Sequence, residues 1–140
     1  MPIPVLEFDW NNLPAIADNI WQAQMAGWPR ILTYRGPLPS PMSRGIRSQT
    51  MTYEVGSQGY RIPKFPTANA RDEYPFACTV EGASISGSQK PWVGHVPPNE
   101  NFVQGGMLSA FIQKHGITAA GPNRQFEVRV INHPRGPVVP

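Results

Sequence analysis

Three carboxylates lie close together near the middle of the chain, in the stretch DEYPFACTVEG that runs from residue 72 to residue 82. Asp72 and Glu73 are adjacent, and Glu81 stands near the end of the stretch. Pro75 restricts the residue before it to an extended conformation, which favours a strand end or a rigid loop over a helix. Carboxylates held in this way bind divalent cations through oxygen or act as general bases. The stretch is therefore the first candidate for a catalytic site.

A second polar group follows at Glu100, Asn101 and Gln104. Asn followed three residues later by Gln is the pattern of a helix capping box, and an Asn oxygen can also ligate a metal, so both roles are open for Asn101. Glu100 is either a carboxylate that supports a site or a first-turn partner of the helix dipole. Gln104 is a candidate for orienting Asn101 or a phosphate. The glycines at 105 and 106 are poor helix formers, which suggests close approach of another backbone or of DNA.

The basic residues are unevenly distributed and rich in arginine, with nine Arg among twelve Arg and Lys in total. Most lie between residues 30 and 71, just before the acidic stretch. Arg44 and Arg47 are three residues apart, so they share one face if the segment is helical, and Arg71 directly precedes Asp72. Arginine suits bidentate phosphate recognition, so these three are candidates for contact with nucleic acid. Charge alone fits a solvated basic loop region equally well.

The hydrophobic pattern predicts an α+β fold in a single domain of residues 1–140. A helix is expected over 13–26, with Asn11 and Asn12 as capping candidates, and a second helix over roughly 100–114 with Val103 on its buried face. Residues 30–34, 92–96 and 126–131 read as strands, and residues 1–10 as an extended arm. His95, in the second of these strands, is a secondary candidate for the site. No apolar run is long enough to span a membrane.

The motifs carry a family resemblance. DEYPFA with Glu81 and Gly82 resembles the signature of the NucA/NucB deoxyribonucleases, and Glu100-Asn101 with Gln104-Gly105 is similar to the family's second signature. The two motifs span about residues 70–116, and a weaker likeness covers residues 26–32. The family usually has two glycines after the glutamate of the first motif, and Ala83 stands at the second of these positions.

The resemblance implies a ββα-metal nuclease core and a largely sequence-nonspecific DNA endonuclease that uses one Mg²⁺ or Mn²⁺. It makes Asp72 the general base, Glu73 and Asn101 the residues that hold or orient the metal, and Glu81 part of the motif. A solvent-exposed Asp has a pKa near 3.9 and is a weak base at neutral pH. We therefore expect Asp72 to be desolvated by its aromatic neighbours or coupled to Glu73.

Cys78 is the single cysteine, so no intrachain disulfide can form, and no signal peptide is visible at the N-terminus. Secreted members of the family carry cysteines around the first motif, and Arg71 stands where one often occurs. These features favour a bacterial toxin domain delivered to the cytoplasm of a target cell, with a cognate immunity protein as partner. Zinc-site spacing and nucleotide-binding loops are absent from the sequence, so no small-molecule cofactor is expected. An RNase toxin and a non-catalytic nucleic-acid-binding domain remain as alternatives.

Overall fold

A computed structural model of the chain describes residues 3–36, 70–76, 78–81 and 92–139. In chain order these residues form β1 (Val5–Asp9), α1 (Pro14–Met25), β2 (Ile31–Thr33), β3 (Ala70–Tyr74), β4 (Trp92–Val96), α3 (Pro98–Lys114) and β5 (Gln125–Ile131). The fold is α+β, as the hydrophobic pattern predicts. Neither described helix is long and apolar enough to cross a membrane.

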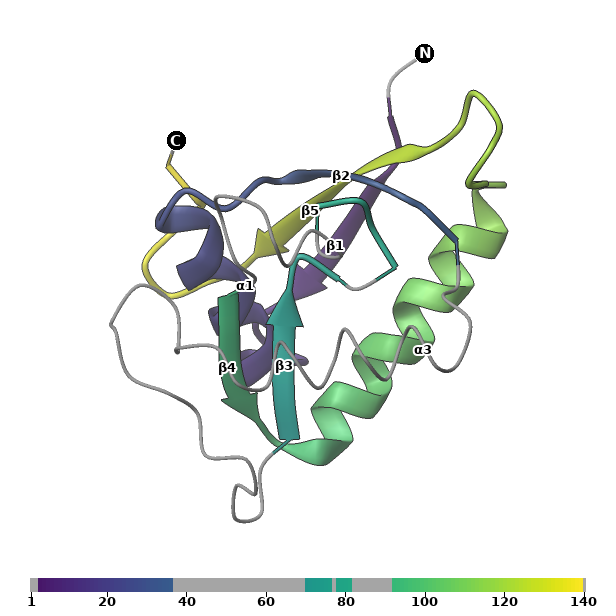
Figure 1. Cartoon of the computed structure of the whole chain (residues 1–140). Helices are drawn as coiled ribbons and strands as arrows, with labels where there is room; N and C mark the ends of the chain where they lie inside the picture. Colours follow the sequence, from purple (N-terminus) through teal and green to yellow (C-terminus); the bar gives the residue numbers. More distant parts are fainter. Residues whose placement is uncertain (1–2, 37–69, 77, 82–91, 140) are drawn as a thin grey trace.

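The described strands form two separate sheets (Figure 1). In the first, β5 lies between β1 and β2, parallel to β1 and antiparallel to β2. The second is an antiparallel pair in which Asp72 of β3 lies opposite Gly94 of β4, and Tyr74 lies opposite Trp92. Residues 1–10, expected to be an extended arm, contain the strand β1. Because β1 pairs with β5, segments near both ends of the chain lie in the same sheet.

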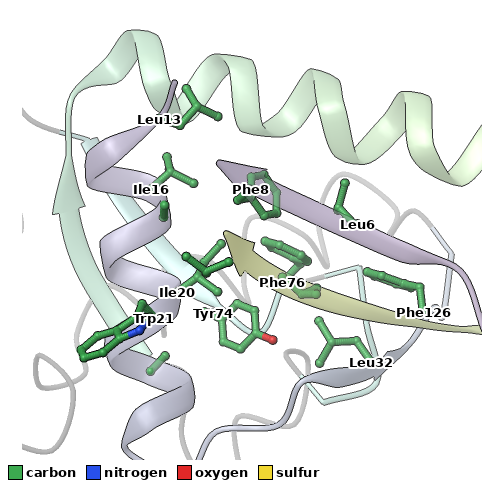
Figure 2. Close-up of a cluster of buried hydrophobic side chains, with 14 of the residues drawn as sticks. Leu6, Phe8, Leu13, Ile16, Ile20, Trp21, Leu32, Tyr74, Phe76 and Phe126 are labelled. Atoms are coloured by element: carbon green, nitrogen blue, oxygen red, sulfur yellow. The ribbon is translucent and has the colours of Figure 1, made fainter. Parts of the chain in front are cut away.

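The helix α1 packs against both sheets and against α3. Its apolar stripe, which includes Ile16, Ala17 and Ile20, is fully buried. Figure 2 shows Ile16 and Ile20 in the same cluster as residues of both sheets, with the Tyr74 ring of β3 close to Ile20, Phe76 and Leu32. Burying an aliphatic or aromatic side chain of this size stabilises the fold by about 1.5–3 kcal/mol. This shared core fixes the position of β3, and of the acidic residues on it, relative to α1.

The order β3, β4, α3 gives two antiparallel strands followed by a helix. In Figure 1 the two strands lie side by side, and α3 leaves the end of β4 and runs diagonally across the molecule. The helix begins at Pro98, whose missing N–H costs nothing in the first turn, and Gly116 follows its end with a positive φ of 60°. The order of elements that the motifs imply is therefore present.

Three local expectations were wrong. Neither Asn11 nor Asn12 caps α1, because the N-cap residue is Leu13 and makes no side-chain cap hydrogen bond. Met25, which the helical pattern over 13–26 makes a core candidate, is 42% exposed at the end of α1. Val103 is 43% exposed, because the buried side of α3 is instead formed by Glu100, Gln104 and Phe111. Polar residues occupy positions on α3 that an apolar stripe would normally fill.

Candidate active site

Asp72 lies in the middle of β3 with its side chain turned toward α1. It is only 3% exposed. The side-chain amide of Asn19, in the middle of α1, donates a hydrogen bond of 2.9 Å to Asp72 Oδ2 and one of 3.3 Å to the Asp72 backbone oxygen. A carboxylate is thus buried between a strand and a helix and held by a neutral donor.

Burial raises the pKa of Asp72 from 3.8 to about 7 because the charged form is poorly solvated there. The hydrogen bond from Asn19 acts in the opposite direction and lowers the pKa. The negative charge of Glu73 raises it further. A carboxylate with a pKa near neutrality is a far better proton acceptor than an ordinary aspartate, which is the property that a general base requires.

Gln104 reaches the same place from α3. It is 6% exposed, and its side-chain amide lowers the pKa of Asp72. Its Nε2 has no hydrogen-bond partner within the described part of the chain, so its approach to the Asp72 carboxylate falls short of a well-aligned hydrogen bond. Asn101 lies one turn earlier on the neighbouring row of α3 and is half-buried. The structure therefore brings Asp72 and Gln104 together, and Asn101 is the neighbour of Gln104 one turn earlier on α3.

Asn101 is not a helix cap. The N-cap of α3 is Pro97, and the Asn101 backbone N–H already donates to the Pro97 carbonyl oxygen at 3.1 Å. The capping-box alternative for Asn101 and Gln104 is therefore wrong, because the N-cap lies four residues earlier than that pattern requires. The side-chain oxygen of Asn101 is not committed to capping and remains a candidate ligand.

Glu100 has a structural task. Its Oε1 accepts hydrogen bonds from the backbone N–H groups of Ala15 and Ile16, at 3.0 and 3.1 Å. These are amides of the first turn of α1, which the α1 sequence itself leaves uncapped. A carboxylate there also complements the positive end of the helix dipole. Glu100 thus fixes α3 against α1, and a direct catalytic role for it stays a prediction.

A family model described as "Deoxyribonuclease NucA/NucB" matches residues 23–129, which is most of the chain. The chain belongs to the NucA/NucB deoxyribonuclease family. Membership supports a hydrolase of the nuclease class with DNA as its substrate. No curated protein matches the chain. The matched range includes Asp72 and the whole of β3, β4 and α3, so Asp72 and Gln104 belong to the NucA/NucB region, whereas Asn19 lies before it.

Two further candidates, Glu73 and His95, do not share the face of the strand pair that carries Asp72. Successive strand residues point to opposite faces, so Glu73 leaves β3 on the face away from Asp72 and is half-buried. His95 lies opposite Arg71 in the strand register and therefore on that same far face, where it is exposed. The structure does not bring His95 together with Asp72. Arg44, Arg47 and the side chain of Arg71 lie outside the described residues.

Glu81, the last acidic residue of the first NucA/NucB motif, contacts β2. Its Oε1 accepts from the Thr33 backbone N–H at 2.8 Å, and its Oε2 accepts from the Thr33 hydroxyl at 3.0 Å. The segment is also held by a bridge between Tyr34 and Thr79. Glu81 therefore ties the end of the motif to the three-stranded sheet, a role that its place in the motif did not predict.

The possible metal ligands of the described residues do not form a cluster of three or more acidic, histidine or cysteine side chains. Asn101 and Glu73 carry the oxygen donors that Mg²⁺ prefers, and Mg²⁺ commonly uses only one or two protein ligands and keeps several waters. The donor chemistry of Asn101 therefore fits this cation, whereas Glu73 leaves the face of β3 opposite Asp72.

Sequence reasoning missed Asn19. Asn19 lies in the apolar stripe of α1 and outside both motifs. The sequence pattern therefore shows only that a polar residue stands on a helix face that is otherwise apolar. A buried polar residue among apolar neighbours is the one available signal, because such a residue must have a hydrogen-bond partner.

Proposed function

We propose that this chain is a metal-dependent, largely sequence-nonspecific DNA endonuclease in which Asp72 is the general base. The observation that supports this most is the state of Asp72 itself. Burial raises its pKa to about 7, and it lies on the first strand of a strand–strand–helix unit in a deoxyribonuclease family. A structural carboxylate gains nothing from such a pKa, whereas a base that works near pH 7 requires it.

In the proposed reaction, Asp72 accepts a proton from a water molecule, and the water oxygen attacks phosphorus. The P–O bond to the leaving sugar oxygen breaks, and that oxygen gains a proton from solvent. Asn19 occupies Oδ2 of Asp72, so the reaction assigns the proton to Oδ1. Proton transfer by a positioned side chain contributes about 10²- to 10⁴-fold to such reactions.

Mg²⁺ or Mn²⁺ is the proposed cofactor, with Asn101 as its proposed ligand. Glu73, whose side chain leaves the face of β3 opposite Asp72, would act through water or as an orienting partner. When bound, the cation would stabilise negative charge on the phosphate and on the leaving oxygen. Gln104 would orient Asn101 or the phosphate through its buried amide, whose Nε2 is left without a hydrogen-bond partner among the described residues. Arg44, Arg47 and Arg71 are proposed contacts to DNA phosphates.

The reaction class is tested by incubating the purified chain with supercoiled plasmid or with a folded RNA, in Mg²⁺, Mn²⁺ or EDTA. We expect nicked and linear plasmid with either metal, intact plasmid in EDTA, and intact RNA throughout. Cleavage of RNA alone, or equal plasmid cleavage in EDTA, contradicts the proposal. The combined change Arg44→Ala and Arg47→Ala should reduce the salt dependence of DNA binding if these residues contact phosphates.

We further propose that the chain acts as a toxin domain that is delivered into a target-cell cytoplasm and neutralised by an immunity protein. The support is indirect: a DNA-cleaving family, a single cysteine and a basic charge balance. Inducing the chain in a bacterial cytoplasm should stop growth and degrade the chromosome, and Asp72→Asn should abolish both effects. Normal growth with intact chromosomal DNA, at matched protein levels, would contradict the toxin role.

A further inference from the structure

Asn19 is a polar residue in an apolar place. It occupies the middle of the buried face of α1, next to Ile16, Ile20 and Ala23, and is 8% exposed. Burying an amide without hydrogen bonds destabilises a fold, and an aliphatic residue would suit the core at this position. The side chain must therefore be explained by what its amide contacts.

The two ends of the Asn19 amide have different partners, and these partners fix its orientation. Trp92 Nε1 donates to Asn19 Oδ1 at 3.0 Å, and Asn19 Nδ2 donates to Asp72 Oδ2 at 2.9 Å. An indole N–H can only donate, so Oδ1 must face Trp92 and the NH₂ group must face Asp72. The flipped amide would turn its oxygen toward the Asp72 carboxylate and its NH₂ toward the indole N–H. Trp92 thus determines that Asn19 presents a donor to Asp72.

Gly94 provides the space for this contact. It lies opposite Asp72 in the strand pair, and a Cβ at position 94 would overlap Asn19 Oδ1 and come within 2.7 Å of Asn19 Cγ. Any other residue at position 94 would push the Asn19 amide away from the sheet. One face of the strand pair therefore carries three matched parts: the carboxylate of Asp72, the indole of Trp92 and the gap at Gly94.

We propose that Asn19 is a positioning residue, which Trp92 orients and Gly94 accommodates, and which holds the Asp72 carboxylate in the geometry required for DNA cleavage. The proposal rests on the function proposed above for Asp72. Asn19 lies four residues before the segment that the family model matches, so the family match does not assign it a role. Its contact with the backbone oxygen of Asp72, at 3.3 Å, further ties the amide to that point of the strand.

The test compares plasmid nicking by Asn19→Leu, Trp92→Phe and wild type, with thermal melts of each. Asn19→Leu keeps the branching and the number of heavy atoms of the Asn side chain but replaces both hydrogen-bonding groups with larger methyl groups. We expect kcat to fall by roughly 10- to 100-fold, because small misplacement of a reacting group has effects of this size, with KM unchanged. Trp92→Phe should lower kcat by less, because Asn19 remains but is no longer held in one orientation.

Trp28→Phe is the matched control. Trp28 contacts Trp92 edge to face, at 5.3 Å between ring centroids, so this change removes similar volume from the same aromatic pair and leaves the Trp92 indole N–H in place. We expect Trp28→Phe to keep the wild-type kcat. A loss of kcat as large as that of Trp92→Phe would show that packing, and not orientation of Asn19, matters, and would overturn the proposal.

A double-variant cycle separates positioning from general damage. If Asn19 acts through Asp72, then Asn19→Leu added to Asp72→Asn leaves the residual rate unchanged, and a further tenfold loss would overturn the proposal. If wild type nicks the plasmid and Asn19→Leu has the same kcat, Asn19 has no part in the mechanism, and the proposed nuclease function is unaffected. A wild-type chain that cleaves no DNA overturns both proposals. If Asn19→Leu does not fold, the comparison of kcat between Trp92→Phe and Trp28→Phe tests the proposal by itself.

Discussion

Asp72 has the properties of a functional residue because of where the fold puts it. An aspartate in the middle of a strand ordinarily faces solvent, whereas this one faces a helix and is 3% exposed. Its neighbours include the neutral donor Asn19, and no ion pair of Asp72 occurs among the described residues. A neutral donor keeps the carboxylate in place without lowering its pKa as far as an arginine would.

The raised pKa of Asp72 predicts how stability depends on pH. The unfolded chain releases this proton near pH 3.8 and the folded chain near pH 7. The folded state therefore binds more protons between these values, and the contribution of Asp72 to the free energy of unfolding falls as pH rises through that range. We expect Asp72→Asn to match wild type near pH 4 and to be more stable at pH 8, by on the order of a few kcal/mol.

Urea denaturation of both proteins in EDTA, from pH 4 to pH 8, measures this difference. Asp72→Asn still offers an oxygen to Asn19, so the comparison isolates the charge. A stability difference that stays constant across this range would show that Asp72 is not buried as a charge in the folded protein.

Two substitutions of Glu100 distinguish its role in capping α1 from a role in catalysis. Glu100→Ala leaves the N–H groups of Ala15 and Ile16 without their acceptor, at a cost of about 1–3 kcal/mol in stability. Glu100→Gln keeps an acceptor oxygen, so we expect a smaller loss of stability and a nicking rate close to wild type. Thermal melts and nicking rates of both variants decide this. A stable but inactive Glu100→Gln would assign Glu100 to the chemistry.

At the scale of elements, the start of α3 determines what Asn101 can do. The helix begins at Pro98, and Asn101 is already in its first turn, so Asn101→Ala removes no cap. We expect stability within about 0.5 kcal/mol of wild type, and a higher Mg²⁺ concentration for half-maximal nicking. A titration of nicking rate against Mg²⁺ makes the measurement. An unchanged Mg²⁺ requirement would remove Asn101 from the metal site.

The Glu81 side chain joins the end of the first motif to the larger sheet, beside the bridge between Tyr34 and Thr79. Glu81→Ala removes the acceptors of both the Thr33 N–H and the Thr33 hydroxyl, and we expect a loss of about 1–3 kcal/mol in urea denaturation. Thr33→Val is the matched control, since it removes the hydroxyl and keeps the backbone N–H bond, and it should have a smaller effect. Equal losses in the two variants would mean that the backbone bond to Glu81 contributes little.

At the scale of the whole molecule, the local parts of the fold were predictable and the long-range contacts were not. The stripe at Ile16, Ala17 and Ile20 predicts α1, and the alternating run before Ile131 predicts β5, because each pattern lies within one element. The cap that Glu100 provides joins residues 85 positions apart, and Asn19 is 53 positions from Asp72. Sequence spacing carries no signal for such pairs, since only tertiary packing brings them together.

In the candidate site, too, some residues could be predicted from the sequence and others could not. The motif resemblance makes Asp72, Gln104 and Asn101 one group, and the structure brings Asp72 and Gln104 together, while the role of Asn101 stays a prediction. Glu73 was grouped with them by sequence adjacency, although neighbouring strand residues face opposite sides. The glycines at 105 and 106 predict close approach of another backbone or of DNA. A Cβ at either residue would meet no atom of the described chain within 4 Å, and close approach at this pair stays a prediction.

The role of Asp72 as the base is tested most directly by the initial rate of plasmid nicking in Mg²⁺ at pH 8, measured for wild type and for Asp72→Asn in parallel. Both proteins should be folded by thermal melt, since Asn fits the site and retains the contact with Asn19. We expect wild type to nick the plasmid and Asp72→Asn to be slower by about 10²- to 10⁴-fold. A folded Asp72→Asn that nicks at the wild-type rate would contradict the assignment of Asp72 as the general base.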